Sequence, residues 1–546
     1  MRRDTPLSNP FDRQPRTALS SLAMAATPPE PGTPPAAGQA ASDARSELVA
    51  EAAGGAGVVL AAELVGRAAR WATTWYLSGA LGAALFGRWS SATTLLLVLG
   101  APLPLGTDLG MVYFGAQHLG RGERAAWKGA LWTGAALAAG GSLAGGFLLW
   151  GAGRVWLAGE RPELAGDLAL LVPALAAWGL LLFLVGVLRA HRAMVAQALS
   201  YQVVLPLGTL FGTALAAHFG LGLPGVFGAL TLATLGTVGL VGWQGWRRTR
   251  DLWRDRALVG PWMPRRLLRW CLPQSLETTL FRANQWMDLL MLTALTAPLV
   301  VGSYRVVLAL ALLCQIPVMA LVTVLNPMLA ALVGQGERAR LEGLVRAATR
   351  WLIVLVAPVA LTLVLVPDLA LAIFDRAYLS GADSLRLLVP GVALFAVYAP
   401  TQRLIPMSGH ARLNLLDHAG AALFNAGLNF MLIPRLGMRG AALATTVSLV
   451  LWSLVSALQV RHLLGCSAWD RRNLALGGAA LGLGALGLAV GAAAPLGWRL
   501  ALLALGCLAF LAVLRFLGLA ADDRHVLGLL RARLARAVAP EGSLHA

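Results

Sequence analysis

The segment "LETTLFRANQWMDLLML" occupies residues 276–292 and combines two properties that rarely occur together. More than half of its residues are Leu, Phe, Met or Trp, and its flanks are apolar too. It nevertheless carries the charged side chains Glu277, Arg282 and Asp288. Whether such a segment lies in a soluble core or spans a bilayer decides the fold, and the composition of the chain answers that question.

The composition indicates an integral membrane protein. Of the 546 residues, 58% are hydrophobic and 13% are charged, whereas globular domains contain about 25% charged residues. Apolar runs of roughly 18 residues or more, the length of a transmembrane helix, recur between about residues 53 and 518. A soluble protein of this composition would have too little polar surface to cover its core.

The pattern predicts an all-α polytopic protein with about fourteen transmembrane helices. The expected spans are 53–77, 86–112, 126–150, 166–188, 195–218, 223–246, 272–296, 300–333, 350–374, 384–405, 413–434, 438–460, 474–494 and 497–518.

The basic residues predict the orientation of these spans. The net charge is +18, but the arginines lie in short loops rather than on one polar face, which argues against nucleic acid as a partner. Alternate loops hold 32 and 7 of the 44 basic residues. This bias predicts that both termini lie in the cytoplasm, and we expect the protein in the bacterial inner membrane.

An internal repeat divides the spans into two lobes. Glu63 precedes Glu277 by 214 residues, and the pairs "GRW"/"GSY", "GRGER"/"GQGER" and "LGLPG"/"LGMRG" keep an offset of 214 or 215. A repeat of six spans returns the chain to the same side, so the two copies have parallel topology, as in transporters. The expected domains are a disordered cytoplasmic tail (1–52), an N-terminal lobe (53–246), a basic cytoplasmic linker (247–271), a C-terminal lobe (272–465), helices 13 and 14 (466–518) and a basic amphipathic C-terminus (519–546).

Charged residues inside the spans are the candidate functional residues, because an ionised side chain at the bilayer centre costs at least about 2.5–3.5 kcal/mol. Glu63, Arg67 and Arg70 share one face of the first span. At about 100° per residue, Glu277, Asn284 and Asp288 fall within roughly 40° of one direction, and Arg282 and Gln285 widen that polar arc. Asp108, Arg88 and Arg305 complete the set.

Structural roles compete with these functional ones. Arg88 and Arg305 lie near span ends and are equally compatible with snorkelling to the headgroups. Glu63 with Arg67, and the carboxylates near Arg282, are also compatible with ion pairs that hold helices together.

Three segments resemble bacterial polysaccharide flippases of the multidrug/oligosaccharidyl-lipid/polysaccharide exporter superfamily. They are "LNFMLIPRLGMRGAALATTVS" (428–448), "VGSYRVVLALALLCQIPVMALVTVLNPMLAALVGQGERARLEGLV" (301–345) and "LSGALGAALFGRWSSATTLLLVLGAPLPLG" (77–106). The resemblance implies two six-helix lobes around a cationic cavity, and an oligosaccharide carried on undecaprenyl pyrophosphate as the cargo.

The resemblance also suggests roles for the charged residues. Arginine suits the pyrophosphate, so the substrate-binding candidates are Arg67, Arg70, Arg282, Asn284, Gln285, Arg88 and Arg305. Glu63, Asp108, Glu277 and Asp288 are candidates for coupling transport to H⁺ or Na⁺. We expect a transporter rather than an enzyme, a monomer without cofactor or metal, surrounded by membrane lipids and working with a polysaccharide polymerase and chain-length machinery.

Three other functions remain open at the sequence level. Lipid II flippases of the same superfamily also have fourteen spans and cavity arginines, and a multidrug or cation antiporter shares the fold. A polytopic glycosyltransferase or O-antigen ligase is less compatible, because the loops on the non-cytoplasmic side are short and carry no paired acidic motif.

Overall fold

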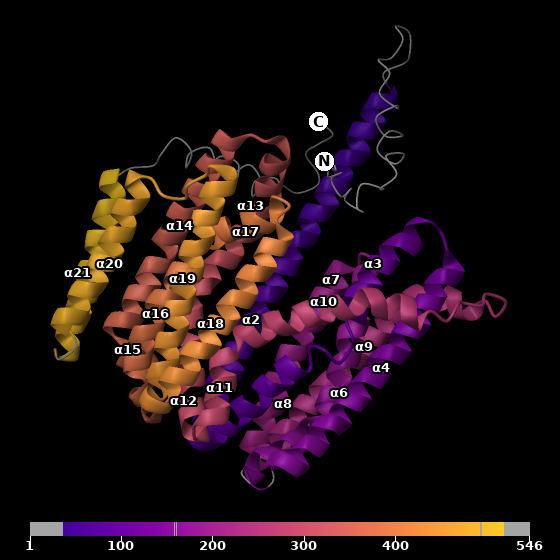
Figure 1. Ribbon diagram of the computed structural model, residues 1–546, viewed down its shortest axis with the longest axis horizontal. Coiled ribbons are helices and arrows are strands. Elements are labelled where there is room, and N and C mark those ends of the chain that lie inside the picture. The colour runs from indigo at the N-terminus through magenta and orange to yellow at the C-terminus, as the bar shows by residue number, and fades with distance from the viewer. Residues whose placement is uncertain (1–35, 158, 160, 492–493, 518–546) are drawn as a thin grey trace, which may run out of the picture. The chain divides into compact units, whose positions relative to one another are not determined.

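The computed structural model describes residues 36–157, 159, 161–491 and 494–517, and all the regular secondary structure in them is helical (Figure 1). The chain divides into residues 1–56 and a compact unit, 57–546, which contains every contact discussed below. The helices of the first lobe are α2 (Ala36–Leu99), α3 (Thr107–Gly120), α4 (Arg124–Ala152), η1 (Gly153–Leu157), α6 (Pro162–Ala190), α7 (Met194–Ala198), η2 (Leu199–Val204), α8 (Leu205–His218) and α9 (Gly222–Arg254).

The second lobe repeats this order and adds two helices. Its elements are α10 (Pro264–Gln285), α11 (Met287–Leu295), α12 (Pro298–Ala311), η3 (Leu312–Gln315), α13 (Ile316–Gln335), α14 (Arg338–Leu365), α15 (Pro367–Ala372), η4 (Arg376–Gly381), α16 (Ala382–Val397), α17 (Ala399–Met407), α18 (Ala411–Leu436) and α19 (Met438–Leu464), followed by α20 (Arg471–Gly491) and α21 (Leu496–Leu517).

The polytopic all-α prediction is confirmed, although the spans are less regular than expected. In the described part of the chain, 11 helices are long and apolar enough to cross a membrane. The first two predicted spans form the continuous segment 57–99, which bends at Gly82 (φ 73°, ψ 164°). The seventh span is divided into α10 and α11, and the eleventh, α18, mixes polar and charged residues with its apolar ones.

The N-terminal tail differs from its prediction. Residues 36–52 were expected to be disordered, but α2 begins at Ala36. This segment is rich in Ala with Glu, Gln and Arg, residues of high helix propensity, and contains no proline. Residues 1–35 of the predicted tail, and the amphipathic C-terminus predicted for 519–546, lie outside the described residues.

The two-lobe repeat is confirmed in the backbone itself. Helices α4 and α14 begin 214 residues apart, and each follows the repeated Gly-Glu turn. Gly122 (φ 69°) and its counterpart Gly336 (φ 70°) both adopt the left-handed conformation. Glycine reaches that region without the steric cost of a Cβ atom, which explains why both copies keep it.

The two copies of the repeat meet at a pair of glycines. Gly87 and Gly302 are equivalent positions, and a Cβ atom on Gly302 would lie 3.1 Å from the Cα atom of Gly87. A Cβ atom on Gly87 would lie 1.7 Å from the Pro298 carbonyl oxygen, and one on Gly302 would lie 2.3 Å from that of Ala83. Each glycine thus lies against the backbone of the other lobe, as a twofold relation between the lobes requires. The absence of side chains allows the two backbones to approach closely.

The first helix of the second lobe is shared between the lobes. Leu267 and Cys271 of α10 belong to a buried apolar cluster with Met111 and Phe114 of α3. After a break at Trp286, α11 packs on α12, α18 and α19. The start of this helix, which lies in the predicted linker, therefore completes the core of the first lobe.

The linker between the lobes is also shorter than predicted. Helix α9 continues to Arg254 and α10 begins at Pro264, which leaves 255–263 of the expected 247–271 as the connection. Lys128 donates a hydrogen bond to the Asp255 carbonyl oxygen (3.0 Å). The linker therefore lies against the start of α4 and carries fewer arginines than expected.

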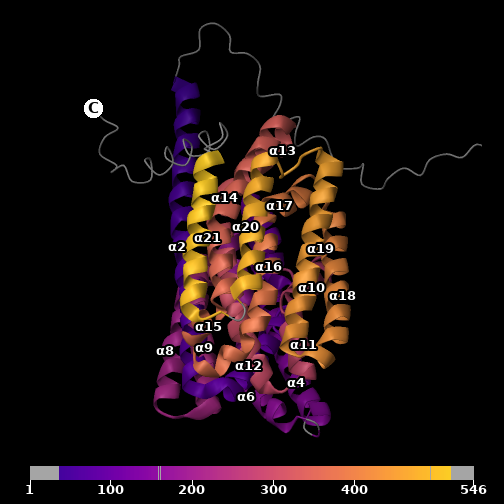
Figure 2. The same cartoon turned by 90° about the vertical axis from the view of Figure 1, so that its left-hand side faces the viewer.

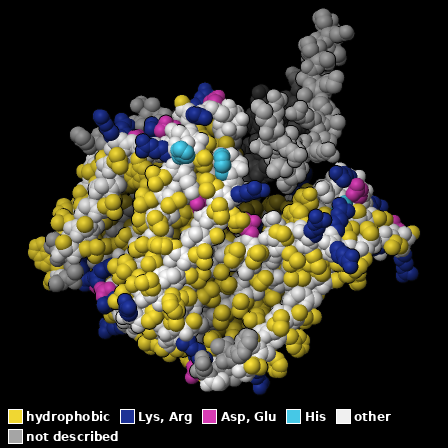
Figure 3. All heavy atoms as spheres, viewed as in Figure 1, with side chains coloured by type: hydrophobic (Ala, Val, Ile, Leu, Met, Phe, Trp, Pro, Cys, Tyr) yellow, Lys and Arg dark blue, Asp and Glu magenta, His cyan; other side chains and the backbone are white. Residues whose placement is uncertain are grey.

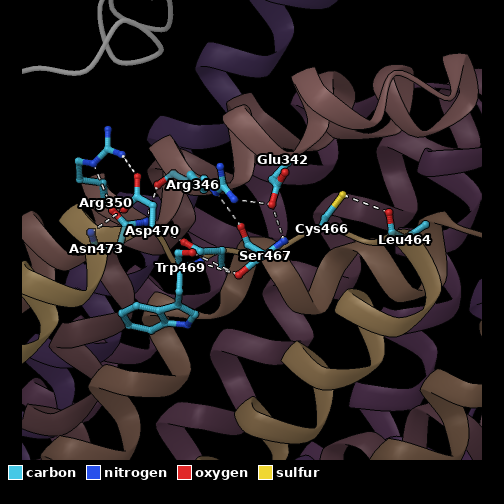
Figure 4. Close-up of polar contacts among 10 residues, drawn as sticks. Glu342, Arg346, Arg350, Leu464, Cys466, Ser467, Trp469, Asp470 and Asn473 are labelled. Atoms are coloured by element: carbon cyan, nitrogen blue, oxygen red, sulfur yellow. Dashed lines mark hydrogen bonds and ion pairs between the residues drawn. The ribbon is translucent and has the colours of Figure 1, made fainter.

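Helices α20 and α21 pack on α14, and a polar network fixes the loop that leads into them (Figures 2 and 4). Arg350 of α14 is 5% exposed, and it donates to Asp470 (3.0 Å) and Asn473 (3.1 Å). One turn earlier, Arg346 pairs with Glu342 (2.6 Å). These charge-assisted bonds anchor the added helices at one end.

The surface and the cysteines agree with the membrane assignment. Hydrophobic side chains cover the middle of the face in Figure 3, and Lys and Arg gather toward its rims. Cys271, Cys314 and Cys466 are buried and unpaired, and no group of metal ligands occurs among the described residues.

Candidate functional site

Glu63, Arg67 and Arg70 form one cluster on α2. The Glu63 carboxylate accepts a hydrogen bond from Nε of Arg67 (3.0 Å) and lies 3.6 Å from Nη2 of Arg70. The side chains are 22%, 37% and 47% exposed, in that order along the chain. The spacing i, i+4, i+7 does place them on one face, and one carboxylate between two guanidinium groups leaves one positive charge uncompensated.

The π-helical segment η2 supports this cluster. Gly66 admits the η2 backbone so closely that a Cβ atom there would lie 1.9 Å from the Gln202 carbonyl oxygen. The Gln202 side chain in turn accepts a long hydrogen bond from Arg70 (3.5 Å). Wide helical turns of this kind often occur at functional sites, and Gln202 extends the polar surface around Arg70.

The predicted polar arc of the seventh span is not continuous. Because the helix ends at Gln285 and restarts at Met287, a regular 100° rotation does not connect Glu277 to Asp288. Glu277 and Gln285 are exposed, and Asn284 is half-buried. Among the described residues no ion pair involves Glu277 or Arg282, so a structural pair between them is not formed here.

Asp288 lies at the start of α11 and is buried within the second lobe. Its carboxylate accepts hydrogen bonds from the Tyr304 hydroxyl (2.6 Å), the Leu289 amide (2.9 Å) and, at 3.5 Å, the Thr445 hydroxyl. These donors come from α11, α12 and α19 and satisfy a carboxylate that is 5% exposed. Asp288 therefore depends on the arrangement of three helices.

Arg305 lies beside an aromatic ring and near Asp288. Its guanidinium lies over the Trp286 ring, 4.8 Å from the centroid, and the positive charge is attracted by Asp288. One terminal nitrogen, Nη1, is buried without a hydrogen-bond partner. A buried donor atom without a partner costs free energy.

Asp108 connects the two lobes electrostatically. It lies in the first turn of α3, where Arg189 of the first lobe and Arg282 of α10 both act on its charge. The positive charge of Arg282 thus acts on an acid of the first lobe, although the two side chains form no ion pair among the described residues.

Arg88 has a different environment from the one predicted. Nε and Nη2 of Arg88 bind the two oxygens of Asp167 at 2.8 Å each, and Glu163 lies 3.4 Å away. Asp167 is 1% exposed. This bidentate pair between α2 and α6 occupies the guanidinium, so the structure favours a structural role for Arg88 over contact with substrate.

The lobes are also joined by contacts that the sequence did not reveal. Arg161, which precedes α6, donates to the Thr293, Ala294 and Thr296 carbonyl oxygens at the end of α11. The Tyr378 hydroxyl donates to the Ser78 carbonyl oxygen (2.8 Å). No local pattern in the sequence indicates this role of Arg161, since the residues that it contacts lie more than 130 positions away.

Comparison with known proteins identifies the fold. No protein-family profile matches the chain, and no curated protein matches its sequence. Among solved structures, the lipid II flippase MurJ in an inward closed conformation is 12% identical, with a TM-score of 0.64 over 83% of this chain and 97% of that one.

Two further structures match over 75% of this chain. An inward-facing multidrug resistance MATE family transporter is 14% identical, with a TM-score of 0.59 over 98% of its own length. A MOP superfamily transporter from Pyrococcus furiosus is 15% identical, with a TM-score of 0.53 over 95% of its length. The two lobes, the repeat and these matches together show that the chain has the fold of MOP superfamily transporters.

Proposed function

We propose that this protein is a flippase that translocates undecaprenyl-pyrophosphate-linked oligosaccharide across the bacterial inner membrane by alternating access, for surface polysaccharide biosynthesis. The observation that carries the proposal is the cluster of Glu63, Arg67 and Arg70, whose two guanidinium groups are partly exposed and share one carboxylate. An anionic diphosphate can replace Glu63 as the partner of both.

The chemistry of the cargo suits this arrangement. Guanidinium groups bind phosphate oxygens through two parallel hydrogen bonds, which an ammonium group cannot do. The sugar headgroup is hydrated and needs a polar path, whereas the isoprenoid tail can stay in the lipid. Gln202, beside Arg70, offers an amide for the sugar or the phosphate.

The main alternatives differ in the charge of the cargo. An exporter of cationic drugs needs an accessible carboxylate, but Glu63 already faces two arginines, so the cluster disfavours cations. A lipid II flippase would carry a cargo with the same diphosphate. The MurJ match covers more of this chain than the MATE match does, which supports a lipid-linked cargo without choosing the glycan.

Coupling to an ion belongs to the same proposal. Asp108 and Asp288 lie on helices that contact more than one element, and each interacts electrostatically with an arginine, Arg282 and Arg305 respectively. Binding of H⁺ or Na⁺ at these carboxylates would change their attraction for Arg282 and Arg305 and so bias the lobe arrangement. We further propose that the protein acts as a monomer beside a polymerase and chain-length machinery, with both termini in the cytoplasm.

The test is a translocation assay with the purified full-length protein in proteoliposomes. Undecaprenyl diphosphate carrying a fluorescent oligosaccharide would be loaded in both leaflets, and the outer pool would be removed enzymatically. The wild type should make the inner pool accessible, and the Arg67→Gln/Arg70→Gln variant should not. Arg121→Gln/Arg124→Gln, which removes equal charge from the α3–α4 turn, is the matched control.

Two results would contradict the proposal. One is equal translocation by the wild type and the Arg67→Gln/Arg70→Gln variant. The other is export of a cationic dye that the lipid-linked diphosphate does not inhibit, which would favour the antiporter alternative.

A further inference from the structure

The end of α9 carries a cavity that the transport proposal does not use. The cavity has a volume of about 460 Å³ and is lined by Ala196 of α7 and by Trp243, Gln244, Arg247 and Arg248 of α9. None of these residues belongs to the Glu63 cluster. The charge bias of the loops predicts that this end of α9 faces the cytoplasm.

The two arginines of the cavity are available to an anion. The Arg247 guanidinium lies over the Trp243 ring, 4.9 Å from its centroid, which orients the group and leaves its N–H edge unused. Arg248 donates from Nη1 to the Gln244 carbonyl oxygen (3.0 Å). The nearest acid along the helix, Asp251, lies 3.8 Å from Arg250, and in the described part of the chain no carboxylate pairs with Arg247 or Arg248.

The positive charge at the cavity comes from its arginines and not from the neighbouring histidine. His191, at the α6–α7 turn, has its pKa lowered by burial and then by the positive charge of Arg248. His191 is therefore mostly neutral at pH 7, and the positive charge of the cavity comes from the arginines. A phosphate oxygen is the anion for which two adjacent guanidinium groups are best suited.

A shallow apolar strip runs from the cavity along α9 toward the middle of the helix. Leu232, Gly236, Gly239 and Trp243 follow one another at helical spacing and are exposed. A Cβ atom added to Gly236 or Gly239 would meet nothing within 4 Å. The other sides of α9 pack on α6 and α8, so this strip is the side left for lipid.

We propose that this cavity is a binding site for the phosphate headgroup of an anionic membrane lipid, with Arg247 and Arg248 holding the phosphate and the Gly236–Gly239 strip holding one acyl chain. Tryptophan at the level of the headgroups is the usual companion of such a position. The site is distinct from the proposed cargo site, because it shares no residue with the Glu63 cluster. Inorganic phosphate could bind the same two arginines as a lipid headgroup does. The Gly236–Gly239 strip favours a lipid, because only a lipid has an acyl chain to place there.

The site can be tested by native mass spectrometry of the full-length protein released from nanodiscs that contain phosphatidylglycerol and phosphatidylcholine. The wild type should retain phosphatidylglycerol preferentially. Arg247→Gln/Arg248→Gln should weaken that retention by about tenfold or more, since two charge-assisted hydrogen bonds are lost. Arg250→Gln/Arg254→Gln removes the same charge from the same helix end, outside the cavity, and should behave as the wild type.

Two further arms separate a lipid site from a phosphate site. Gly239→Leu fills the strip and should reduce phosphatidylglycerol retention. As a control for folding, the melting temperature of this variant in phosphatidylcholine alone should equal that of the wild type. Inorganic phosphate should compete only weakly. Equal loss in both arginine variants would overturn the site, and full competition by phosphate together with normal binding by Gly239→Leu would overturn the lipid assignment.

Discussion

At the scale of single residues, the charges inside the membrane differ mainly in the partners they have. The Glu63 carboxylate lies between Arg67 and Arg70, and Arg88 forms an ion pair with Asp167. The Arg305 guanidinium lies over the Trp286 ring, and its Nη1 atom has no hydrogen-bond partner. Of these three arrangements, the first alone combines uncompensated charge with exposure, and Glu277 is exposed without an ion pair among the described residues. This difference separates a candidate binding site from structural ion pairs, which sequence spacing alone does not do.

The first prediction concerns the unequal distribution of arginines between the lobes. The positions equivalent to Arg67 and Arg70 are Phe281 and Asn284, so the second lobe has no matching cluster. Arg67→Gln or Arg70→Gln should therefore reduce translocation about tenfold or more, and Arg282→Gln should reduce it less. The measurement is the initial rate in proteoliposomes, normalised to reconstituted protein, and a larger effect of Arg282→Gln would contradict the prediction.

The second prediction concerns Arg88 and Asp167. Arg88→Met leaves a buried carboxylate without its partner, which should cost about 3–5 kcal/mol of stability. The double variant Arg88→Met/Asp167→Leu removes both charges and should recover much of that loss. Thermal unfolding in detergent measures both, and an unchanged melting temperature in Arg88→Met would show that the pair is not structural.

The sequence predicted the helix face and the pairing of charges that are close along the chain, but not the pairing of charges that are far apart. It placed Glu63, Arg67 and Arg70 on one face because their spacing is local. It could not pair Arg88 with Asp167, 79 residues later, or Asp288 with Thr445, since such contacts depend on how helices pack. Tyr304 was missed because a tyrosine in an apolar span carries no charge to mark it.

At the scale of elements, glycines determine how closely helices approach. The repeat was detected from Gly-rich motifs, and the structure explains their persistence through the turn at Gly122 and Gly336 and the contact of Gly87 with Gly302. The break at Trp286 had no such signal, because "NQWMD" contains neither Gly nor Pro. The sequence of that segment therefore predicts a continuous helix.

The third prediction concerns the crossing at Gly87. Gly87→Leu places a side chain where a carbonyl oxygen of the other lobe lies, so the lobes must separate at this point. The variant should unfold at a lower temperature and expose engineered cysteines along the lobe interface to maleimide. Gly140→Leu is the control, since a Cβ atom there meets nothing within 4 Å; equal behaviour of the two would contradict the prediction.

The fourth prediction uses Cys466 to report on the anchor of α20. Burial, and then the negative charge of Glu342, raise the pKa of the Cys466 thiol, so little thiolate is present at pH 7. Maleimide should label it slowly, and faster as the pH rises toward that pKa. Asp470→Asn weakens the bond to Arg350 and should speed labelling about tenfold by loosening the loop.

The labelling experiment belongs in a Cys507→Ser background, because Cys507 is only partly buried and would react before the buried Cys466. Cys466→Ser identifies the labelled site by mass. An Asp470→Asn variant that labels no faster than its parent would show that the network in Figure 4 does not hold the loop.

At the scale of the whole molecule, the lobes are closed against each other at the ends where Arg161 and Tyr378 lie. These contacts join α6 to α11 and the η4 segment to α2. A transporter that alternates must break them in every cycle. Arg161 is the most specific of these contacts, since its guanidinium reaches three carbonyl oxygens at the end of one helix, where a cation is favoured.

The fifth prediction follows from that contact. Arg161→Ala removes three charge-assisted hydrogen bonds between the lobes, so it should favour the arrangement in which the lobes are separate on this side by about tenfold or more. Spin-label distances between the α6 and α12 ends of the lobes measure the shift. Arg154→Ala is the control, because Arg154 is on the same side but lies over Trp150 of its own lobe; identical distance distributions in the two variants would contradict the prediction.

The shared helix α10 means that the two lobes are not separable modules. The first lobe takes Leu267 and Cys271 into its core from a segment that follows its own repeat unit. This exchange resembles a domain swap made permanent within one chain. A first lobe expressed alone as 53–246 should therefore leave a hydrophobic hole beside Met111 and Phe114, and a stable half-protein would have to extend to at least residue 285.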